Sequence, residues 1–354
     1  MSKIAIIGTT TWGITLGTVL SQKKLAVSLW ARTDKEALIL KASGPKLKRL
    51  PDDFCFPPHL TVTSSIEEAL YGADAVILAV PSQTMRQNIK LVSPYITSSM
   101  LVISAAKGLE IETGKRMSQV IADEINKDFW YNICVLSGPN LAWEILHGYP
   151  AVTIVAADKD AQTKKAHKLL TSPNFCAYTN TDVIGVELGG ALKNIIALGA
   201  GIVDGLGYGD NAKAALITRG LTEITAMGTA MGANPLTFSG LAGLGDLIAT
   251  CESNLSRNHY VGVELTKGRS LEEITKAMDC IAEGVTTTMV TQRLAQQMEL
   301  EMPITERIYQ VLYEGADPRK ATVGLMSAAA SHELAGHKWK LFSLFRRRRI
   351  KVPD

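Results

Sequence analysis

Lys193 is the only charged side chain in the segment GGALKN, residues 189–194, which lies in the longest apolar stretch of helical spacing. On a helix, Gly189, Gly190, Lys193 and Ala197 share one face, so that face carries almost no bulk except an ammonium group. Two adjacent glycines destabilise a helix interior by roughly 1 kcal/mol each, which close approach of a ligand or of another backbone would offset. The alternative is a tight helix-packing face with Lys193 reaching out to solvent.

The first 30 residues predict the strand–helix–strand unit that binds dinucleotides. Residues 3–30 read as a buried strand, a helix and a second buried strand. The turn after the first strand should read G-x-G-x-x-G, but from Gly8 to Gly13 it reads GTTTWG. Thr10 replaces the second glycine, and we expect its β-carbon to crowd the phosphates. The N-terminus of the helix and the threonine hydroxyls still favour an anion at this turn.

Other side chains are suited to phosphate groups or lie where ligands bind. Arg257 and Asn258 offer a fork of donors and an amide, which suit a phosphate. Arg32 follows the second strand, where it could pair with the 2′-phosphate of NADP(H), so the sequence favours NADP(H) without excluding NAD(H). Lys107 follows the expected strand 101–105, and ligands of open α/β sheets bind outside the carboxyl ends of strands. Ordinary solvated charges are the alternative for Arg32 and Lys107.

The pattern of elements changes near residue 180, which predicts an α/β chain of two domains. A doubly wound, Rossmann-like sheet is expected in residues 1–183, followed by an all-α domain in 184–340 and a basic tail in 341–354. The expected strands are 3–8, 26–30, 60–63, 73–80, 101–105, 133–137, 151–156 and 176–179. After a cap at Asp182, the expected helices are the apolar stretch from 186, then 211–231, 247–251, 271–278, 286–298 and 304–314, with a turn at 281–284.

Composition narrows the class of protein. The chain has 354 residues, is 46% hydrophobic and 20% charged, and its net charge of +3 is too small to indicate a nucleic-acid partner. Its five cysteines form no CxxC pair and no zinc-ligand spacing, which favours a reducing compartment and no metal. Residues 4–22 lack charge, but a strand, turn and helix explain them better than a signal peptide or anchor. We therefore expect a cytoplasmic protein without stable membrane insertion. The four arginines at 346–349 indicate a solvated tail, with an anionic membrane surface or nucleic acid as the alternative.

Several long blocks, in order, resemble bacterial NAD(P)-dependent glycerol-3-phosphate dehydrogenase. They run over residues 4–324 and include AVPS at 79–82, AKGL at 106–109, LSGP at 136–139, GGALKN at 189–194, DGLGYGDNAKAALITRG at 204–220, GLAGLGDL at 240–247, LSRN at 255–258 and AEGV at 282–285. The resemblance implies a Rossmann domain and a helical substrate domain. It also implies reversible hydride transfer between NAD(P)H and dihydroxyacetone phosphate, which gives sn-glycerol 3-phosphate for glycerophospholipid synthesis.

The resemblance also implies roles for individual residues. Lys193 matches the lysine that transfers the proton. The substrate contacts match Lys107, Gly138, Asn140, Lys193, Asp246, Ser256, Arg257 and Asn258. With Gly8 and Gly13 of the turn, the cofactor contacts match Thr11, Trp12, Arg32, Lys107, Ala142, Arg257, Ile281 and Glu283. Two positions depart from the family pattern: Thr10 replaces a glycine, and Asn140 replaces a serine but keeps hydrogen-bonding capacity.

The implied reaction explains why a buried lysine is wanted. As hydride reaches the carbonyl carbon, negative charge develops on the oxygen, and a nearby cation must stabilise and protonate it. Lys193 would do both if Lys107 and desolvation make its ammonium more acidic, with Asp246 orienting it. Two alternatives stay open: a homologue that binds nucleotide weakly and acts as a sensor or partner protein, and an enzyme for another β-hydroxyacid. A homodimer is also possible.

Overall fold

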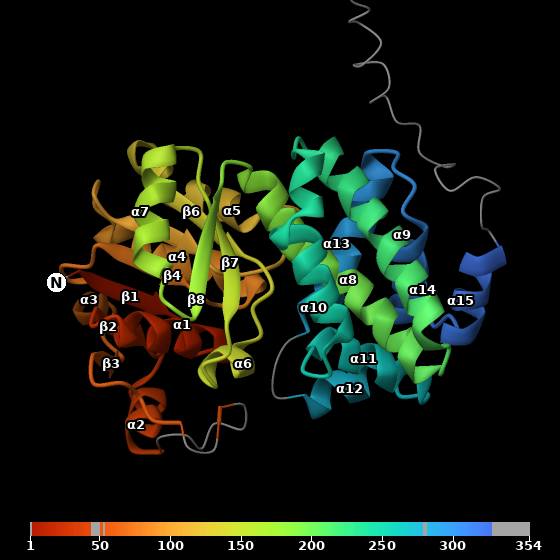
Figure 1. Ribbon diagram of the computed structural model, residues 1–354, viewed down its shortest axis with the longest axis horizontal. Helices are drawn as coiled ribbons and strands as arrows, with labels where there is room; N and C mark the ends of the chain where they lie inside the picture. The colour runs from red at the N-terminus through yellow and green to blue at the C-terminus, as the bar shows by residue number, and fades with distance from the viewer. Residues whose placement is uncertain (1, 44–49, 52–53, 279–281, 328–354) are drawn as a thin grey trace, which may run out of the picture.

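The computed structural model describes residues 2–43, 50–51, 54–278 and 282–327. A sheet covered by helices forms the first half, and a group of helices packed side by side with it forms the second (Figure 1). The predicted α/β class with an all-α second half is therefore confirmed. The predicted domain limits at 183 and 340 remain predictions, and the basic tail lies outside the described residues.

The eight predicted strands all form, and they join in one sheet of order β3-β2-β1-β4-β5-β6-β7-β8. The strands are β1 (Lys3–Ile7), β2 (Ala26–Trp30), β3 (Leu60–Thr63), β4 (Ala75–Leu78), β5 (Leu101–Ser104), β6 (Ile133–Ser137), β7 (Ala151–Ala156) and β8 (Phe175–Asn180). Every neighbouring pair is parallel except β6 with β7. Because β1, β2, β4, β5 and β6 run the same way, the loops that follow them meet at one edge of the sheet, where ligands bind in this class.

Helices cover both faces of the sheet because its central strands are apolar on both sides. The side chains of Ile4 and Ile6 share one core with α1 (Thr11–Gln22), α2 (Asp34–Ser43), α6 (Ala142–Leu146) and α7 (Asp160–Leu170). Those of Ala5 and Ile7 share the opposite core with α3 (Ile66–Leu70), α4 (Met85–Val92) and α5 (Met117–Glu124). The sheet is thus the rigid support for the loops at its carboxyl edge.

The second half is built around α8 (Val183–Gly205), which Asp182 caps by accepting a hydrogen bond from the Gly185 amide. Around α8 pack α9 (Gly209–Ala230), α10 (Asp246–Glu252), α11 (Arg257–Thr266) and α13 (Glu283–Gln297). The remaining helices of the described chain are α12 (Leu271–Ala277), α14 (Pro303–Tyr313) and α15 (Pro318–Ser327). By length and composition α8 could cross a membrane, but 83% of its most apolar window is buried in the protein, as expected of a core helix.

Three details of the second half differ from the sequence prediction. The first helix, expected from residue 186, begins at Val183, and Gly207 and Gly209 adopt positive φ values of 70° and 76° in the turn that separates it from α9. Where a turn was expected at 281–284, Ala282 is the N-cap of α13, which begins at Glu283, and residue 281 lies outside the described residues. Helices α11 and α15 were not predicted, since short polar segments such as RNHY carry little apolar periodicity.

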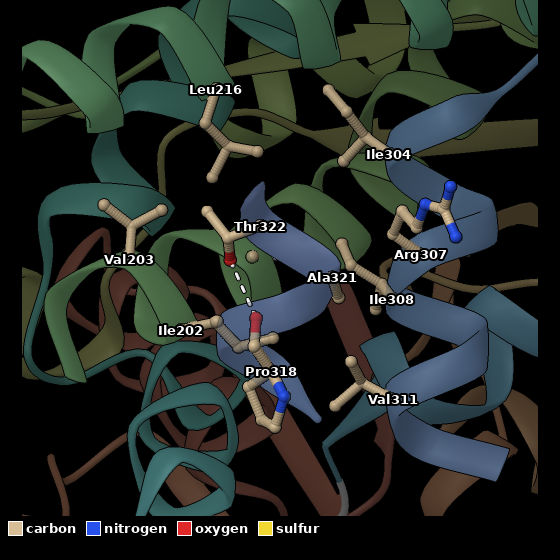
Figure 2. A pocket seen from close by; sticks show the side chains of 11 residues that line it. Ile202, Val203, Leu216, Ile304, Arg307, Ile308, Val311, Pro318, Ala321 and Thr322 are labelled. Atoms are coloured by element: carbon tan, nitrogen blue, oxygen red, sulfur yellow. Dashed lines mark hydrogen bonds between the residues drawn. The ribbon is translucent and has the colours of Figure 1, made fainter. Parts of the chain in front are cut away.

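A small apolar cavity lies among α8, α9, α14 and α15, lined by Ile202, Leu216, Ile308 and Val311 (Figure 2). Its volume is about 30 Å³, room for about two water molecules and far below the several hundred Å³ of a typical ligand pocket. The cavity is a packing gap of the helical half, so the functional site has to be sought at the edge of the sheet.

Candidate active site

The turn from β1 to α1 needs glycine at its first and last positions. Gly8 has a φ of +112°, and a β-carbon there would lie 2.7 Å from the carbonyl oxygen of Ala79 at the end of β4. A β-carbon on Gly13 would lie 2.1 Å from the carbonyl oxygen of Gly8, because α1 packs directly on the end of β1. Both distances are shorter than any real carbon contact, so side chains are excluded and the backbone forms a close cradle at this edge.

Thr10 replaces the middle glycine without backbone strain. Its φ and ψ are −64° and 157°, which any residue adopts, and it is the N-cap of α1. Its hydroxyl accepts from the Gly13 amide at 3.1 Å and donates to the Ala79 carbonyl at 2.8 Å. The side chain thus holds the turn to β4. Whether its β-carbon crowds a phosphate is untested and remains a prediction.

Three more of the predicted nucleotide contacts, Thr11, Trp12 and Arg32, lie in or near the same turn. Thr11 and Trp12 open the 12-residue helix α1, whose N-terminus gives the turn a positive dipole. The Trp12 ring packs edge-on against Phe175, with centroids 6.3 Å apart. Arg32 is exposed just after β2. A glycine cradle that no β-carbon can enter, facing a helix N-terminus, fits the pyrophosphate of a dinucleotide.

A second cluster centres on Asp246, which is 1% exposed at the start of α10. One carboxylate oxygen accepts from the ammonium of Lys193, and the other accepts from that of Lys107 at 2.6 Å. Lys193 also donates to the Thr250 hydroxyl, which in turn donates to the Asp246 carbonyl at 2.6 Å. With both lysines charged, two ammonium groups and one carboxylate leave the cluster one net positive charge, suited to an anionic ligand or a developing oxyanion.

Tight packing of the glycine face of α8 places Lys193 in this cluster. A β-carbon on Gly189 would lie 2.3 Å from the Ala242 carbonyl oxygen, and one on Gly190 would lie 2.3 Å from the Ser137 hydroxyl at the end of β6. The destabilisation of the helix by two adjacent glycines is thus compensated by close packing of α8 against another backbone segment and against the edge of the sheet. Lys193 is only 6% exposed, so the interpretation that it reaches out to solvent is wrong.

Lys107 joins the two halves, because it follows β5 of the sheet and its ammonium reaches Asp246 of the helical half. The same ammonium donates to the Gly138 carbonyl at 2.8 Å. The pKa of Lys107 is lowered from its usual value to about 8, mainly by burial. The Asp246 carboxylate opposes this shift, and the Lys193 ammonium adds to it. Lys107 therefore gives up its proton more readily than a free lysine.

The loop after β6 is held by backbone and amide contacts. Gly138 has a φ of +133°, which favours glycine. The Asn140 side chain donates to the Val152 carbonyl at 2.8 Å and accepts from the Thr153 hydroxyl at 2.9 Å. The amide that replaces a serine thus anchors the loop to β7. Ala142 lies just beyond, as the first residue of α6.

The segment Ser256–Asn258 begins α11. Ser256 is the N-cap and accepts from the His259 amide, and Arg257 is exposed. Asn258 is 7% exposed; its amide donates to the Asn194 side chain at 2.9 Å and accepts from the Gly284 amide at 2.9 Å. It therefore ties together α8, α11 and α13 next to Lys193.

Glu283 connects α13 to the loop after β4. Its carboxylate accepts from the Ser82 amide at 2.9 Å and from the Ser82 hydroxyl. A β-carbon on Gly108 would lie 3.1 Å from the same carboxylate, so Glu283 lies beside the Lys107 loop. Burial raises the pKa of Glu283, while the Ser82 donors and the nearby Arg257 cation oppose the shift. Ile281, the other predicted contact of this segment, lies outside the described residues.

The structure thus links Lys107, Gly138, Lys193 and Asp246 by direct contacts. Glu283 lies beside the Lys107 loop, and Asn258 is bound to Asn194, the residue after Lys193. The predicted nucleotide contacts of the β1–α1 turn form a separate group along the same edge of the sheet. Sequence reasoning missed Thr250, Ser82 and Glu36. The i, i+4 spacing of Thr250 from Asp246 on α10 was the available signal. Nothing local in the sequence pairs Ser82 with Glu283, which lies 201 residues later.

Two models of one family match the chain in order. The model described as the N-terminus of NAD-dependent glycerol-3-phosphate dehydrogenase matches residues 3–163, and the model of its C-terminus matches residues 182–323. A glycerol-3-phosphate dehydrogenase [NAD(P)+] of Dehalococcoides mccartyi is 68% identical over 355 aligned positions, covering 100% of this chain and 99% of the relative. One from Pelotomaculum thermopropionicum is 43% identical and covers 94% of this chain and 95% of its own.

The fold agrees with a solved structure of the same class. The crystal structure of a glycerol-3-phosphate dehydrogenase from Coxiella burnetii superposes with a TM-score of 0.86 at 35% identity, over 92% of this chain and 98% of that one. The family models match both halves, and the relative is similar along the entire length. Both agree with the glycine cradle and with the lysine pair on Asp246. The chain belongs to the NAD-dependent glycerol-3-phosphate dehydrogenase family and is a nicotinamide-dependent oxidoreductase.

Proposed function

We propose that this protein reduces dihydroxyacetone phosphate to sn-glycerol 3-phosphate, reversibly, with NAD(P)H, as a supplier of glycerol 3-phosphate for glycerophospholipid synthesis. The observation that carries the proposal is the pair of ammonium groups on one buried carboxylate, where the sheet meets the helical half. This pair lies at the edge of the sheet that also carries the glycine cradle. A bound nicotinamide would supply the hydride.

Lys193 is the general acid of the proposed reaction. As the carbonyl carbon is reduced, its oxygen gains negative charge, which the Lys193 ammonium stabilises and then neutralises by giving up a proton. Asp246 and Thr250 accept hydrogen bonds from this ammonium and so fix its direction. Lys107 adds a second positive charge beside it and contacts both substrate and cofactor.

The phosphate of the substrate is bound at the start of α11. Ser256, Arg257 and Asn258 bring a hydroxyl, a guanidinium and an amide to a helix N-terminus, which is a favourable place for a dianion. Gly138 and Asn140, from the loop after β6, are the other proposed substrate contacts, and Gly138 is linked to the lysine cluster through Lys107. In this arrangement the net positive charge of the lysine cluster attracts the substrate before chemistry begins.

The cofactor contacts are proposed along the edge of the sheet. Gly8, Thr11, Trp12 and Gly13 would hold the pyrophosphate. Ala142, Ile281 and Glu283 are further proposed cofactor contacts, and Lys107 and Arg257 are proposed to be shared between cofactor and substrate. Arg32 gives a weak preference for NADP(H) over NAD(H) through the 2′-phosphate. The mechanism uses no metal, because the lysines supply the positive charge at the reacting oxygen.

Further parts of the proposal concern the whole chain. Residues 1–183 form the nucleotide domain and residues 184–340 the substrate domain. The protein works in the cytoplasm, without stable membrane insertion or a nucleic-acid partner, and a homodimer is its proposed assembly. The alternative of a catalytically impaired sensor is not favoured, since Lys107, Lys193 and Asp246 are in contact and Thr10 fits its turn without strain.

The test is a titration followed by an assay. NADPH and NADH are titrated separately by isothermal calorimetry, and nucleotide oxidation is then followed at 340 nm with dihydroxyacetone phosphate. Binding of at least one nucleotide and turnover that depends on dihydroxyacetone phosphate support the proposal. Binding without turnover would indicate the sensor alternative, and turnover only with another 2-oxo or 3-oxo acid would indicate a different substrate.

A further inference from the structure

Glu36 lies between Arg32, the predicted 2′-phosphate contact, and the β1–α1 turn. It lies in the first turn of α2, and one of its carboxylate oxygens accepts from the Arg32 amide at 3.0 Å. The other accepts from the Thr9 hydroxyl, inside the β1–α1 turn. A single carboxylate therefore bridges the loop after β1 and the loop after β2.

Those two loops frame the ribose of a dinucleotide in this fold. An acidic side chain near the end of the second strand accepts hydrogen bonds from the ribose hydroxyls, whereas a basic side chain there suits a 2′-phosphate. This chain carries both, because exposed Arg32 follows β2 and the half-buried Glu36 carboxylate lies on the Arg32 amide. Two donors of these loops, the Arg32 amide and the Thr9 hydroxyl, are thus already bound to an anion, beside the arginine that is predicted to pair with a 2′-phosphate.

We propose that Glu36 is a specificity-determining residue that opposes Arg32, so that the protein accepts both NAD(H) and NADP(H). With NAD(H), the carboxylate accepts a hydrogen bond from the ribose 2′-hydroxyl. With NADP(H), it has to leave the Arg32 amide and the Thr9 hydroxyl and lies close to a phosphate of like charge. The inference rests on the proposed nucleotide site and adds to it a residue that the resemblance does not assign.

The decisive variant is Glu36→Gln, which removes the charge and keeps the shape. We expect the dissociation constant for NADPH to fall at least about tenfold, because repulsion between two like charges in contact is relieved. The constant for NADH should rise by about threefold or less, as a neutral acceptor replaces a charged one. The measured quantity is the ratio of the two constants, from calorimetric titration of the purified full-length protein at fixed ionic strength.

Asp34→Asn is the matched control. Asp34 lies in the same turn of α2, but its carboxylate accepts from the Ser64 hydroxyl and not from the nucleotide turn. The Asp34→Asn variant should leave the ratio of the two dissociation constants within about twofold of the wild type, since it removes one nearby negative charge without changing a contact of the nucleotide turn. If Glu36→Gln melts at a much lower temperature than the wild type, Glu36→Ser takes its place and has to move the ratio the same way.

An unchanged ratio in a folded Glu36 variant overturns the inference, and so does an equal shift in Asp34→Asn. Equal changes in both dissociation constants would show that Glu36 only fastens the two loops together. If the wild-type protein binds neither nucleotide, the proposed function itself fails. That outcome is distinct from the failure of this inference, in which both nucleotides bind and the ratio of their dissociation constants is the same in the Glu36 variant as in the wild type.

Discussion

The β1–α1 turn and the lysine cluster at Asp246 both lie at the carboxyl edge of the sheet, but they depend on different parts of the chain. In the turn, close backbone contacts at Gly8 and Gly13 shape the site. The Thr10 side chain is bound to the Ala79 carbonyl of the protein. In the cluster, three charged side chains from β5's loop, α8 and α10 make direct ion pairs.

This difference explains which departures from a family pattern are tolerated. A backbone site accepts a side chain where φ and ψ are ordinary and the β-carbon has space, as at Thr10 with its two hydrogen bonds, but not at Gly8 or Gly13. A buried charge cluster has no such freedom, because removing one member leaves another charge without its partner in a place shielded from water. Four predictions, from the largest effect to the smallest, test this contrast.

Lys193→Met should nearly abolish turnover. Loss of the general acid typically costs roughly 10²–10⁴-fold and loss of oxyanion stabilisation roughly another 10²-fold, so kcat should fall by about 10⁴-fold or more. The dissociation constant for NADPH should stay within about twofold, because Lys193 is not among the proposed nucleotide contacts. Steady-state kinetics and calorimetry measure the two quantities.

The control for that variant is Lys213→Met, since Lys213 is also shielded and pairs with Asp204 away from the cluster. It should keep most of the wild-type kcat. Retention of most of the kcat by Lys193→Met would remove this lysine from the mechanism.

Gly13→Ala should cause the largest loss of nucleotide affinity of the variants in the turn. Its β-carbon would meet the Gly8 carbonyl at 2.1 Å, so the backbone has to shift, at roughly 2–3 kcal/mol of stability. Because the same shift opens the cradle, nucleotide affinity should fall more than about tenfold. Thermal melting and calorimetry follow both effects. An alanine variant that binds nucleotide like the wild type would show that the cradle is not the nucleotide site.

The pH dependence of kcat/KM should reveal Lys107. Its pKa is lowered to about 8, so the ammonium loses its proton as the pH rises through about 8, and the site loses positive charge. The rate constant kcat/KM for dihydroxyacetone phosphate should then fall by up to about tenfold per pH unit above that value. In Lys107→Arg the guanidinium stays charged, so the fall should move to higher pH. A wild-type profile that is flat from pH 7 to pH 10 would contradict this assignment.

Thr10→Gly restores the usual glycine pattern and should have the smallest effect. The variant loses the N-cap bond and the bond to Ala79, which lowers stability by about 1 kcal/mol. Nucleotide affinity should change by less than about threefold, since backbone and not the side chain forms the cradle. A much tighter binding of NADPH by this variant would mean that the Thr10 β-carbon does crowd the phosphates, as the sequence suggested.

Much of the architecture could be predicted from the sequence, because strands and core helices are marked by local apolar patterns. All eight strands and the change to helices after residue 180 followed from short β-branched runs and 3.6-residue spacing. The antiparallel place of β7 and the helix α11 did not follow. Strand order depends on which neighbours pair, and a short polar helix such as RNHYVGVELT is stabilised mainly by packing on α8.

By itself the sequence determined that Lys193 lies on a face of small residues, that Gly8 and Gly13 bound a turn after a strand, and that Lys107 follows another strand. These are local facts of residue type and spacing. Only the tertiary structure decided that Lys107 and Lys193 share Asp246, that Glu283 is bound by Ser82, and that Glu36 lies on Thr9 and Arg32. Most of these partners are far apart in the chain, and their contacts form because buried charges and polar groups require partners once the two halves exclude water.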